Sequence, residues 1–193
     1  MRHRTRTTRA TPEVLVLLSG GLDSAACLAF FADIGQPSMA LHVDYGQPAR
    51  HNEARAARAV AAHFGAPLEI RTVTSALPKT PGLIPGRNAF LVALALLEAP
   101  PGIRTIAIGV HSGTAYADCS PEFVSLMADM AARSTNNLVR VSAPFVSWSK
   151  ADIAAYARER GLPIGITYSC EEGRAAPCGS CSSCLDRKAV DAS

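Results

Sequence analysis

The chain has 193 residues, of which 48% are hydrophobic and 18% are charged, and its formal net charge is +3. This length and composition exclude overall disorder and allow one sizeable core, while the mild charge argues against a dedicated nucleic-acid binder. No stretch is apolar for long enough to predict a membrane span or a secretory signal, so we expect a cytoplasmic protein.

Residues 1–12 hold much of the excess positive charge, which lies on Arg2, Arg4, Arg6 and Arg9. We expect this stretch to be a basic, disordered leader and residues 13–193 to form a single domain. An RNA-binding arm is the alternative interpretation. Such an arm usually works beside a basic face, which the rest of the sequence does not predict.

Short apolar runs alternate with helical patterns along the chain. The run at 14–18 predicts a buried strand, and residues 25–34 follow with helical spacing and Gly35 as a C-terminal cap. The same criteria predict strands at 39–43, 68–73, 105–110 and 138–143, and helices at 52–64, 88–99, 121–133 and 150–160. Ser120 and Ser149 carry the hydroxyl that is typical of a helix N-cap. The proline-rich stretch 74–86 predicts a loop within the domain.

Five short strands alternating with helices predict an α/β fold. The strands should form a five-stranded parallel sheet with helices on both faces, because parallel strands need crossover connections. In such a sheet ligands bind beyond the carboxyl ends of the strands. Functional residues are therefore expected in the loops that follow the strands, at 19–24, 44–51, 109–119 and 144–150.

The loop S-G-G-L-D-S at 19–24 has the composition of an anion site. Its two glycines let backbone N–H groups approach a ligand, and the following helix points its positive end at the same place. Its serine hydroxyls can donate to phosphate oxygens, and Asp23 can hold the Mg²⁺ that a phosphate shares. The alternative is an ordinary strand-to-helix turn in which Asp23 or Ser24 is the N-cap.

Six cysteines in a cytoplasmic chain argue against a disulfide framework. Cys27 lies in an apolar helical run and Cys119 stands alone. The remaining four suit a closed, structural Zn²⁺ site made by Cys170, Cys178, Cys181 and Cys184, within a zinc-binding segment at 167–190. An iron–sulfur cluster and an unmetallated or redox cluster are the alternatives.

Several segments occur in a distinctive order along the chain. They are SGGLDS at 19–24, DYGQ at 44–47 with His51 and Glu53 after it, PGRN at 85–88, YADC at 116–119 followed by PEF, SKADI at 149–153, and TYSC at 167–170 leading into CGSCSSC and Arg187. Together they resemble the 7-cyano-7-deazaguanine synthases, the QueC-like enzymes of the queuosine precursor pathway. The resemblance covers most of residues 14–190, and it implies a Rossmann-like PP-loop fold and a homodimer.

The resemblance implies an ATP-dependent carbon–nitrogen ligase that uses ATP twice. The first ATP adenylates the carboxylate of 7-carboxy-7-deazaguanine so that ammonia forms an amide, and the second activates the amide oxygen so that dehydration gives a nitrile. ATP, Mg²⁺ and Zn²⁺ are the implied cofactors. This interpretation involves neither a nucleic acid nor a membrane.

Site residues follow from the same resemblance. The implied catalytic residues are Asp23, Arg87 and Lys150, two of them cations that stabilise charge developing on phosphorus. The implied ATP-binding residues are Leu18, Ser19, Gly20, Gly21, Leu22, Asp23, Ser24, Asp44, Gly109 and Lys150. The implied substrate-binding residues are Tyr45, Gln47, Arg87, Asn88, Tyr116, Asp118 and Cys119. Among these, Asp118 is expected to accept hydrogen bonds from the guanine-like edge of the substrate.

Two alternative functions stay open. The segment 109–119 is two residues shorter than is usual in the family and has His111 where an asparagine is expected, which leaves the acceptor open. A related ligase would stop at the amide or join the acid to another amine, including one on a protein in a defence system. A zinc-ribbon nucleic-acid-binding module is the other alternative, against which the 6% aromatic content argues.

Overall fold

The computed structural model describes residues 10–74, 82–114 and 116–191. Its five parallel strands form one sheet in the order β3-β2-β1-β4-β5, which confirms the expected fold class. The strands are β1 (Val14–Leu17), β2 (Ser38–Asp44), β3 (Leu68–Thr72), β4 (Thr105–Ile108) and β5 (Arg140–Ser142). The chain runs outward from β1 to β3 and then crosses to β4, so the order reverses between β1 and β4. Ligands bind at such a reversal, which places the site at the loops after these two strands.

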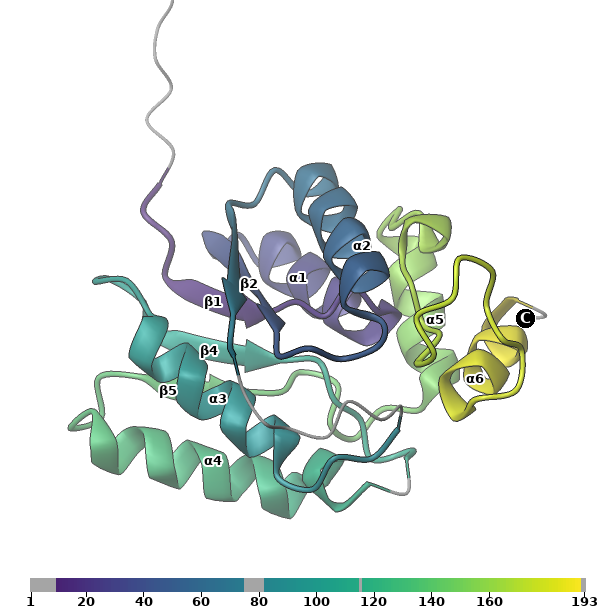
Figure 1. Ribbon diagram of the computed structural model, residues 1–193. Coiled ribbons are helices and arrows are strands. Elements are labelled where there is room, and N and C mark those ends of the chain that lie inside the picture. The colour runs from purple at the N-terminus through teal and green to yellow at the C-terminus, as the bar shows by residue number, and fades with distance from the viewer. Residues whose placement is uncertain (1–9, 75–81, 115, 192–193) are drawn as a thin grey trace, which may run out of the picture.

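The helices cover both faces of this sheet. They are α1 (Leu22–Asp33), α2 (Arg50–His63), α3 (Arg87–Glu98), α4 (Pro121–Ser134), α5 (Lys150–Glu159) and α6 (Ser182–Asp191), with short 3₁₀ turns at Ala117–Cys119 and Ile164–Ile166. Helix α5 packs against α1 and shares its hydrophobic cluster. Figure 1 shows α1 and α2 on one side and α3 and α4 on the other, with α6 beyond the strand ends. The C-terminal segment is thereby placed near the carboxyl ends of the strands.

Most expected elements are confirmed, with two corrections. Helix α1 begins at Leu22 rather than at residue 25, and Gly21 is its N-cap without a side-chain hydrogen bond. Asp23 and Ser24 therefore lie inside the first helical turn, and the interpretation of either residue as an ordinary N-cap is wrong. Helix α6 was not expected, because its polar, cysteine-containing sequence was assigned to a metal-binding loop.

Two helix starts carry the expected hydroxyl caps. Ser120 Oγ accepts a hydrogen bond from the backbone N–H of Phe123 at 3.1 Å. Ser149 and Asp152 form a reciprocal capping box at the start of α5, in which each side chain accepts from the other residue's backbone N–H. The capping box fixes the first turn of α5, which begins with Lys150.

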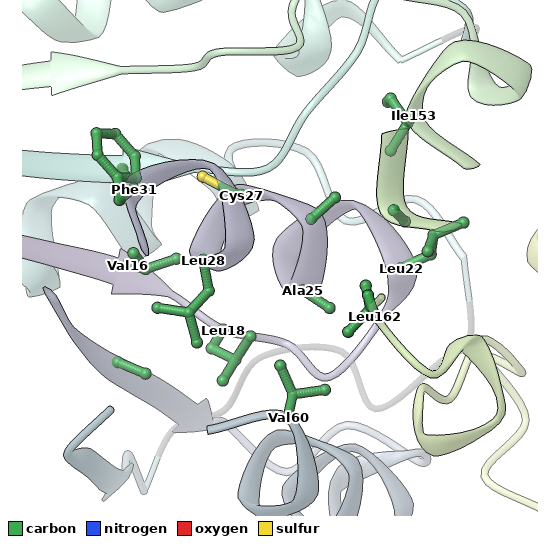
Figure 2. Packing of buried hydrophobic residues seen from close by; sticks show 14 of the residues in the cluster. Val16, Leu18, Leu22, Ala25, Cys27, Leu28, Phe31, Val60, Ile153 and Leu162 are labelled. Atoms are coloured by element: carbon green, nitrogen blue, oxygen red, sulfur yellow. The ribbon is translucent and has the colours of Figure 1, made fainter. Parts of the chain in front are cut away.

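The central strand β1 separates two hydrophobic clusters. Val14 and Val16 pack in the cluster under α1, α2 and α5, whereas Leu15 and Leu17 pack in the cluster under α3 and α4. Figure 2 shows Val16 and Leu28 of α1 in the first cluster. Because the strand is buried on both faces, each of its side chains contributes about 1.5–3 kcal/mol of burial energy. The loop after β1 is thus attached to a rigid part of the fold.

Some sequence-based expectations fall outside the described residues. These are the first nine residues of the basic leader and residues 75–81 of the loop at 74–86. Within the described ranges, no helix combines the length and the apolar character that a membrane span requires.

Candidate functional site

A cavity of about 290 Å³ opens at the carboxyl ends of β1, β2 and β4. It brings together most residues implied by the sequence, namely Leu18, Ser19, Gly21, Leu22, Asp23, Ser24, Tyr45, Gln47, Arg87, Asn88, Gly109, Tyr116, Cys119 and Lys150. Gly20, Asp44 and Asp118 do not line it. The segments that line the cavity are far apart in the sequence, and the reversal of strand order brings them together.

The turn after β1 is closed by its own side chains. The hydroxyl oxygens of Ser19 and Ser24 lie 3.0 Å apart, and the Ser24 hydroxyl donates to the Gly21 carbonyl at 3.0 Å. The Gly21 N–H donates to Ser19 Oγ at 3.3 Å. Since α1 starts directly after Gly21, the N–H groups of its first turn have no acceptor within the helix. These N–H groups, the helix dipole and the two hydroxyls together suit an anion.

Two glycines near this turn are required by close packing. Gly20 has a φ of +90°, and a Cβ there would lie 2.6 Å from the carbonyl oxygen of Glu53 in α2. A Cβ on Gly109 would lie 2.5 Å from the carbonyl oxygen of Asp23 in α1. Gly20 thus lets the turn pack directly on α2, and its expected contact with ATP stays a prediction.

Asp23 and Lys150 form an ion pair beside the turn. Lys150 Nζ donates to Asp23 Oδ1 at 2.7 Å and to Oδ2 at 2.8 Å. On the other side of the carboxylate, His111 Nε2 lies 3.8 Å from Asp23 Oδ2. Burial lowers the pKa of His111, and the nearby Asp23 carboxylate opposes this shift. His111 Nδ1 is buried and has no hydrogen-bond partner among the described residues.

A second polar group follows β2. Gln47 donates to Glu53 Oε2 at 2.8 Å and accepts from the Tyr45 N–H at 2.9 Å, so it holds this loop in place. Burial raises the pKa of Glu53, and the Gln47 amide and the Arg87 guanidinium oppose that shift. Burial also raises the pKa of Tyr45, again opposed by Arg87. Asp44 Oδ1 accepts from the Gly46 N–H at 2.9 Å and thereby stabilises the turn.

The start of α3 is joined to the 3₁₀ turn at Ala117–Cys119. Asn88 is buried, and its side-chain amide donates to the Asp118 carbonyl at 2.9 Å. Its backbone N–H donates to Asp118 Oδ2 at 3.4 Å. The Asp118 carboxylate therefore faces the start of α3 rather than the cavity. Tyr116 and Cys119, on either side of it, do line the cavity.

The four clustered cysteines converge on one point. The Sγ atoms of Cys170, Cys178, Cys181 and Cys184 all lie within 4.8 Å of one another. Those of Cys178 and Cys184 are 3.8 Å apart. Backbone N–H groups of Ser180 and Cys181 lower the pKa of Cys178 to about 6, which favours the thiolate that binds metals. The described residues thus offer a four-sulfur metal site.

The segment that carries these cysteines also forms a wall of the cavity. The Tyr168 N–H donates to the Gly20 carbonyl at 2.9 Å, which attaches the segment to the turn after β1. Glu171 Oε1 accepts from Ser182 Oγ at 3.0 Å, and from the N–H and Oγ of Ser183 at 3.3 and 2.7 Å. Glu171 therefore lines the cavity beside the start of α6, to which its carboxylate is hydrogen-bonded.

Sequence reasoning missed this wall and several other polar lining residues. They are His42, Glu53, His111, Thr114, Tyr168, Ser169, Glu171, Ser182, Ser183 and Asp186. Several of them lie in segments that the sequence did single out, although no role was assigned to them: Glu53, His111, Thr114, Tyr168, Ser169, Ser182 and Ser183. The residues between the cysteines carried no separate signal, because their spacing indicates only metal binding.

Comparisons with known proteins agree with this arrangement. The family model described as "Queuosine biosynthesis protein QueC" matches residues 13–80 and 71–191. A protein of Halobacterium salinarum named 7-cyano-7-deazaguanine synthase is 33% identical over an alignment of 201 positions, which covers 90% of this chain and 88% of the relative. A protein of the same name from Novosphingobium aromaticivorans is 37% identical over an alignment of 212 positions, which covers 92% of this chain and 89% of the relative.

A solved structure has a similar fold. NMN synthetase from Francisella tularensis aligns with a TM-score of 0.58 and 14% identity, covering 95% of this chain and 78% of that protein. At this identity the likeness shows the fold alone.

Proposed function

Because this chain belongs to the QueC family, we propose that it is an ATP-dependent 7-cyano-7-deazaguanine synthase. It adenylates the carboxylate of 7-carboxy-7-deazaguanine, lets ammonia displace AMP to form the amide, and activates the amide oxygen with a second ATP so that dehydration gives the nitrile. One observation carries the proposal: the family match includes every residue that lines the cavity.

The turn at 19–24 is the proposed site of the ATP phosphates. First-turn N–H groups of α1 and the hydroxyls of Ser19 and Ser24 face the same space, which is the donor set that an anionic phosphate chain requires. Leu18, Gly21 and Gly109 line the cavity next to them. Adenylation requires the substrate carboxylate to attack the α-phosphorus as pyrophosphate leaves, so donors fixed at the pyrophosphate stabilise the leaving group.

Lys150 and Arg87 are the proposed electrostatic residues. Lys150 is held beside the phosphate turn by Asp23, at 2.7 Å, and it balances charge that develops on the phosphates. Arg87 faces the cavity from the start of α3, where its charge acts on Tyr45 and Glu53. We therefore assign Lys150 to the phosphates and Arg87 to the carboxylate of the substrate.

Asp23 also fits the proposed Mg²⁺. A carboxylate oxygen beside a phosphate site is the ligand that Mg²⁺ prefers, and when bound the ion supplies charge neutralisation at the phosphates. Both Asp23 oxygens accept from Lys150, so a bound ion would share this carboxylate with the lysine. Asp23 would thus bind both the fixed cation of Lys150 and the exchangeable Mg²⁺.

Zn²⁺ is the proposed occupant of the four-sulfur site. A tetrahedral ion with Zn–S bonds of about 2.3 Å requires sulfur–sulfur distances of about 3.8 Å, and Cys178 and Cys184 have that separation. An iron–sulfur cluster distributes its four thiolates over two or four iron atoms and so needs some of them farther apart than the four sulfurs lie here, all within 4.8 Å of one another. The closed site has no open position, so its role is to hold the segment 167–190 against the cavity.

A homodimer and a cytoplasmic location complete the proposal. Leu97 of α3 and Leu126 of α4 are 85% and 62% exposed, and these two helices pack side by side on one face of the sheet. Exposed leucines on two adjacent helices suit contact with a second copy of the chain. Light scattering coupled to gel filtration tests the homodimer, since the polar double variant L97E/L126E is expected to be monomeric.

The proposed location is the cytoplasm, because it keeps thiolate ligands reduced and supplies ATP.

Neither alternative function is favoured. The relatives carry the name of the nitrile synthase, which does not favour a ligase that stops at the amide or joins the acid to another amine, such as a protein amine. A zinc-ribbon nucleic-acid-binding module is not favoured either, because the family match extends over the phosphate turn as well as the cysteines.

Product analysis tests the proposal directly. The purified protein is incubated with 7-carboxy-7-deazaguanine, ATP, Mg²⁺ and ¹⁵N-ammonium, and AMP, pyrophosphate and the deazapurine products are quantified. Two AMP per ¹⁵N-labelled nitrile are expected. Accumulation of the labelled amide without nitrile at saturating ATP and ammonium would refute the synthase and leave the ligase, and no AMP release would refute both.

A further inference from the structure

A site for 7-carboxy-7-deazaguanine needs an acceptor for the amino and ring N–H groups of its guanine-like edge. Asp118 was expected to supply it, but this residue does not line the cavity. Its carboxylate instead accepts from the backbone N–H of Asn88. Among the described residues, the carboxylates that do line the cavity belong to Asp23, Glu53, Glu171 and Asp186.

Three of these carboxylates have other surroundings. Both oxygens of Asp23 accept from Lys150 at the phosphate turn. Glu53 accepts from Gln47 and lies in the field of Arg87. Asp186 is exposed, and its charge acts on His111, which lies beside Asp23 at the phosphate end. Asp23 and Asp186 thus lie toward the phosphate end, and the charge of Glu53 is opposed by Arg87, so none of the three is an acceptor that lies away from the phosphate turn without a cation beside it.

Glu171 lies away from the phosphate turn and has a free acceptor oxygen. Its Oε1 is fixed by three donors at the start of α6, whereas Oε2 has no hydrogen-bond partner among the described residues. The Tyr116 hydroxyl lies 3.4 Å from Ser182 Oγ, and Ser182 Oγ in turn donates to Glu171. Tyr116 is one of the implied substrate-binding residues. The carboxylate is therefore oriented, half-buried and next to the implied substrate site.

We propose that Glu171 recognises the guanine-like edge of the substrate, an inference that rests on the function proposed above. The ring N–H and the exocyclic amino group of a 7-deazaguanine are adjacent donors. The free Oε2 of an ionised carboxylate is a pure acceptor with two lone pairs, so it can accept from both. The cavity must also bind the adenine of ATP without exchanging the two bases. Adenine carries an acceptor nitrogen at the corresponding position, so a carboxylate there repels it.

The test compares Glu171→Gln with the matched control Glu172→Gln. Glutamine has one donor in place of an acceptor, so E171Q is expected to raise the KM for 7-carboxy-7-deazaguanine about 10- to 100-fold. The KM for ATP and the bound metal per chain should stay within twofold of wild type. Glu172 is exposed and does not line the cavity, so E172Q should leave all three quantities unchanged.

A second measurement compares the substrate with an analogue, in wild type and in E171Q. In wild type, an analogue of the substrate that lacks the exocyclic amino group should have a KM at least tenfold higher than the substrate. E171Q should raise the KM of this analogue by a smaller factor than it raises that of the substrate, because only the ring N–H contact is left to lose. An unchanged KM for the substrate in E171Q, an increase in the KM for ATP instead, or equal use of the analogue by wild type would overturn the role of Glu171 alone. Absence of AMP release by wild type would refute the proposed function, and this inference with it.

Discussion

Gly20 offers the sharpest test of how the phosphate turn is built. Its φ is +90°, and a Cβ would lie 2.6 Å from the Glu53 carbonyl oxygen and 2.9 Å from the Ala56 Cβ. Both neighbours belong to α2, so neither can retreat without moving the helix. Gly161 is a matched control, because its φ is +68° and a Cβ there would meet nothing within 4 Å.

The two substitutions to alanine should differ by the contact with α2. The left-handed backbone costs a residue with a Cβ about 1–2 kcal/mol, which is the whole expected loss for Gly161→Ala. Overpacking against α2 adds about 1–3 kcal/mol in Gly20→Ala. The total loss of unfolding free energy at Gly20 is therefore about 2–5 kcal/mol, and each kcal/mol lowers the Tm by roughly 2–4 °C in a chain of this size.

Urea denaturation of both variants, with m-values compared to wild type, measures these losses. The KM for ATP is measured in parallel, and it should rise in G20A and stay unchanged in G161A, because only the first substitution displaces the phosphate turn. Equal losses of stability in the two variants would refute the idea that close packing on α2 holds the turn.

Three further predictions concern charge, pH and the metal. Lys150→Met should lower kcat/KM for ATP about 10²- to 10³-fold, because it removes a cation that stabilises the phosphates. It should change the free energy of unfolding by less than about 1 kcal/mol, because the ion pair with Asp23 is partly exposed. Unchanged ATP kinetics would contradict this role of Lys150. Burial lowers the pKa of His42 below the ordinary histidine value of 6.5. As the pH falls below 6.5, His42 is therefore protonated in the unfolded state before it is protonated in the folded state. Stability is then complete above pH 6.5 and is lost as the pH falls. His42→Leu should flatten that profile by up to about 1.4 kcal/mol per pH unit in urea melts at several pH values, and an unaltered slope would contradict it. Cys181→Ser, or chelation, should remove one equivalent of zinc, measured by elemental analysis, and lower the Tm; full thermal stability of the metal-free protein would contradict a structural site.

Local sequence patterns predicted much of the fold because their causes are local. The apolar run at 14–17 is buried on both faces, and Ser120 and Ser149 cap helices through hydrogen bonds to residues three positions away. Helix α6 was missed for the opposite reason. Its sequence is polar, and only packing of its buried Val190 and Cys184 gives it a place in the fold.

The sequence by itself determined the two compact units of the site, the phosphate turn at 19–24 and the four cysteines at 170–184. Each is encoded within a few residues, since hydroxyls, glycines or thiols at short spacing can meet only in a few ways. Tertiary structure alone decided which acid lies beside the implied substrate residue Tyr116 in the cavity. Asp118 lies nearer the expected substrate residues in the sequence, yet Asn88 holds it outside the cavity. The fold instead carries Glu171 across the strand ends, because Tyr168 is attached to Gly20 and long-range contacts of this kind leave no local pattern.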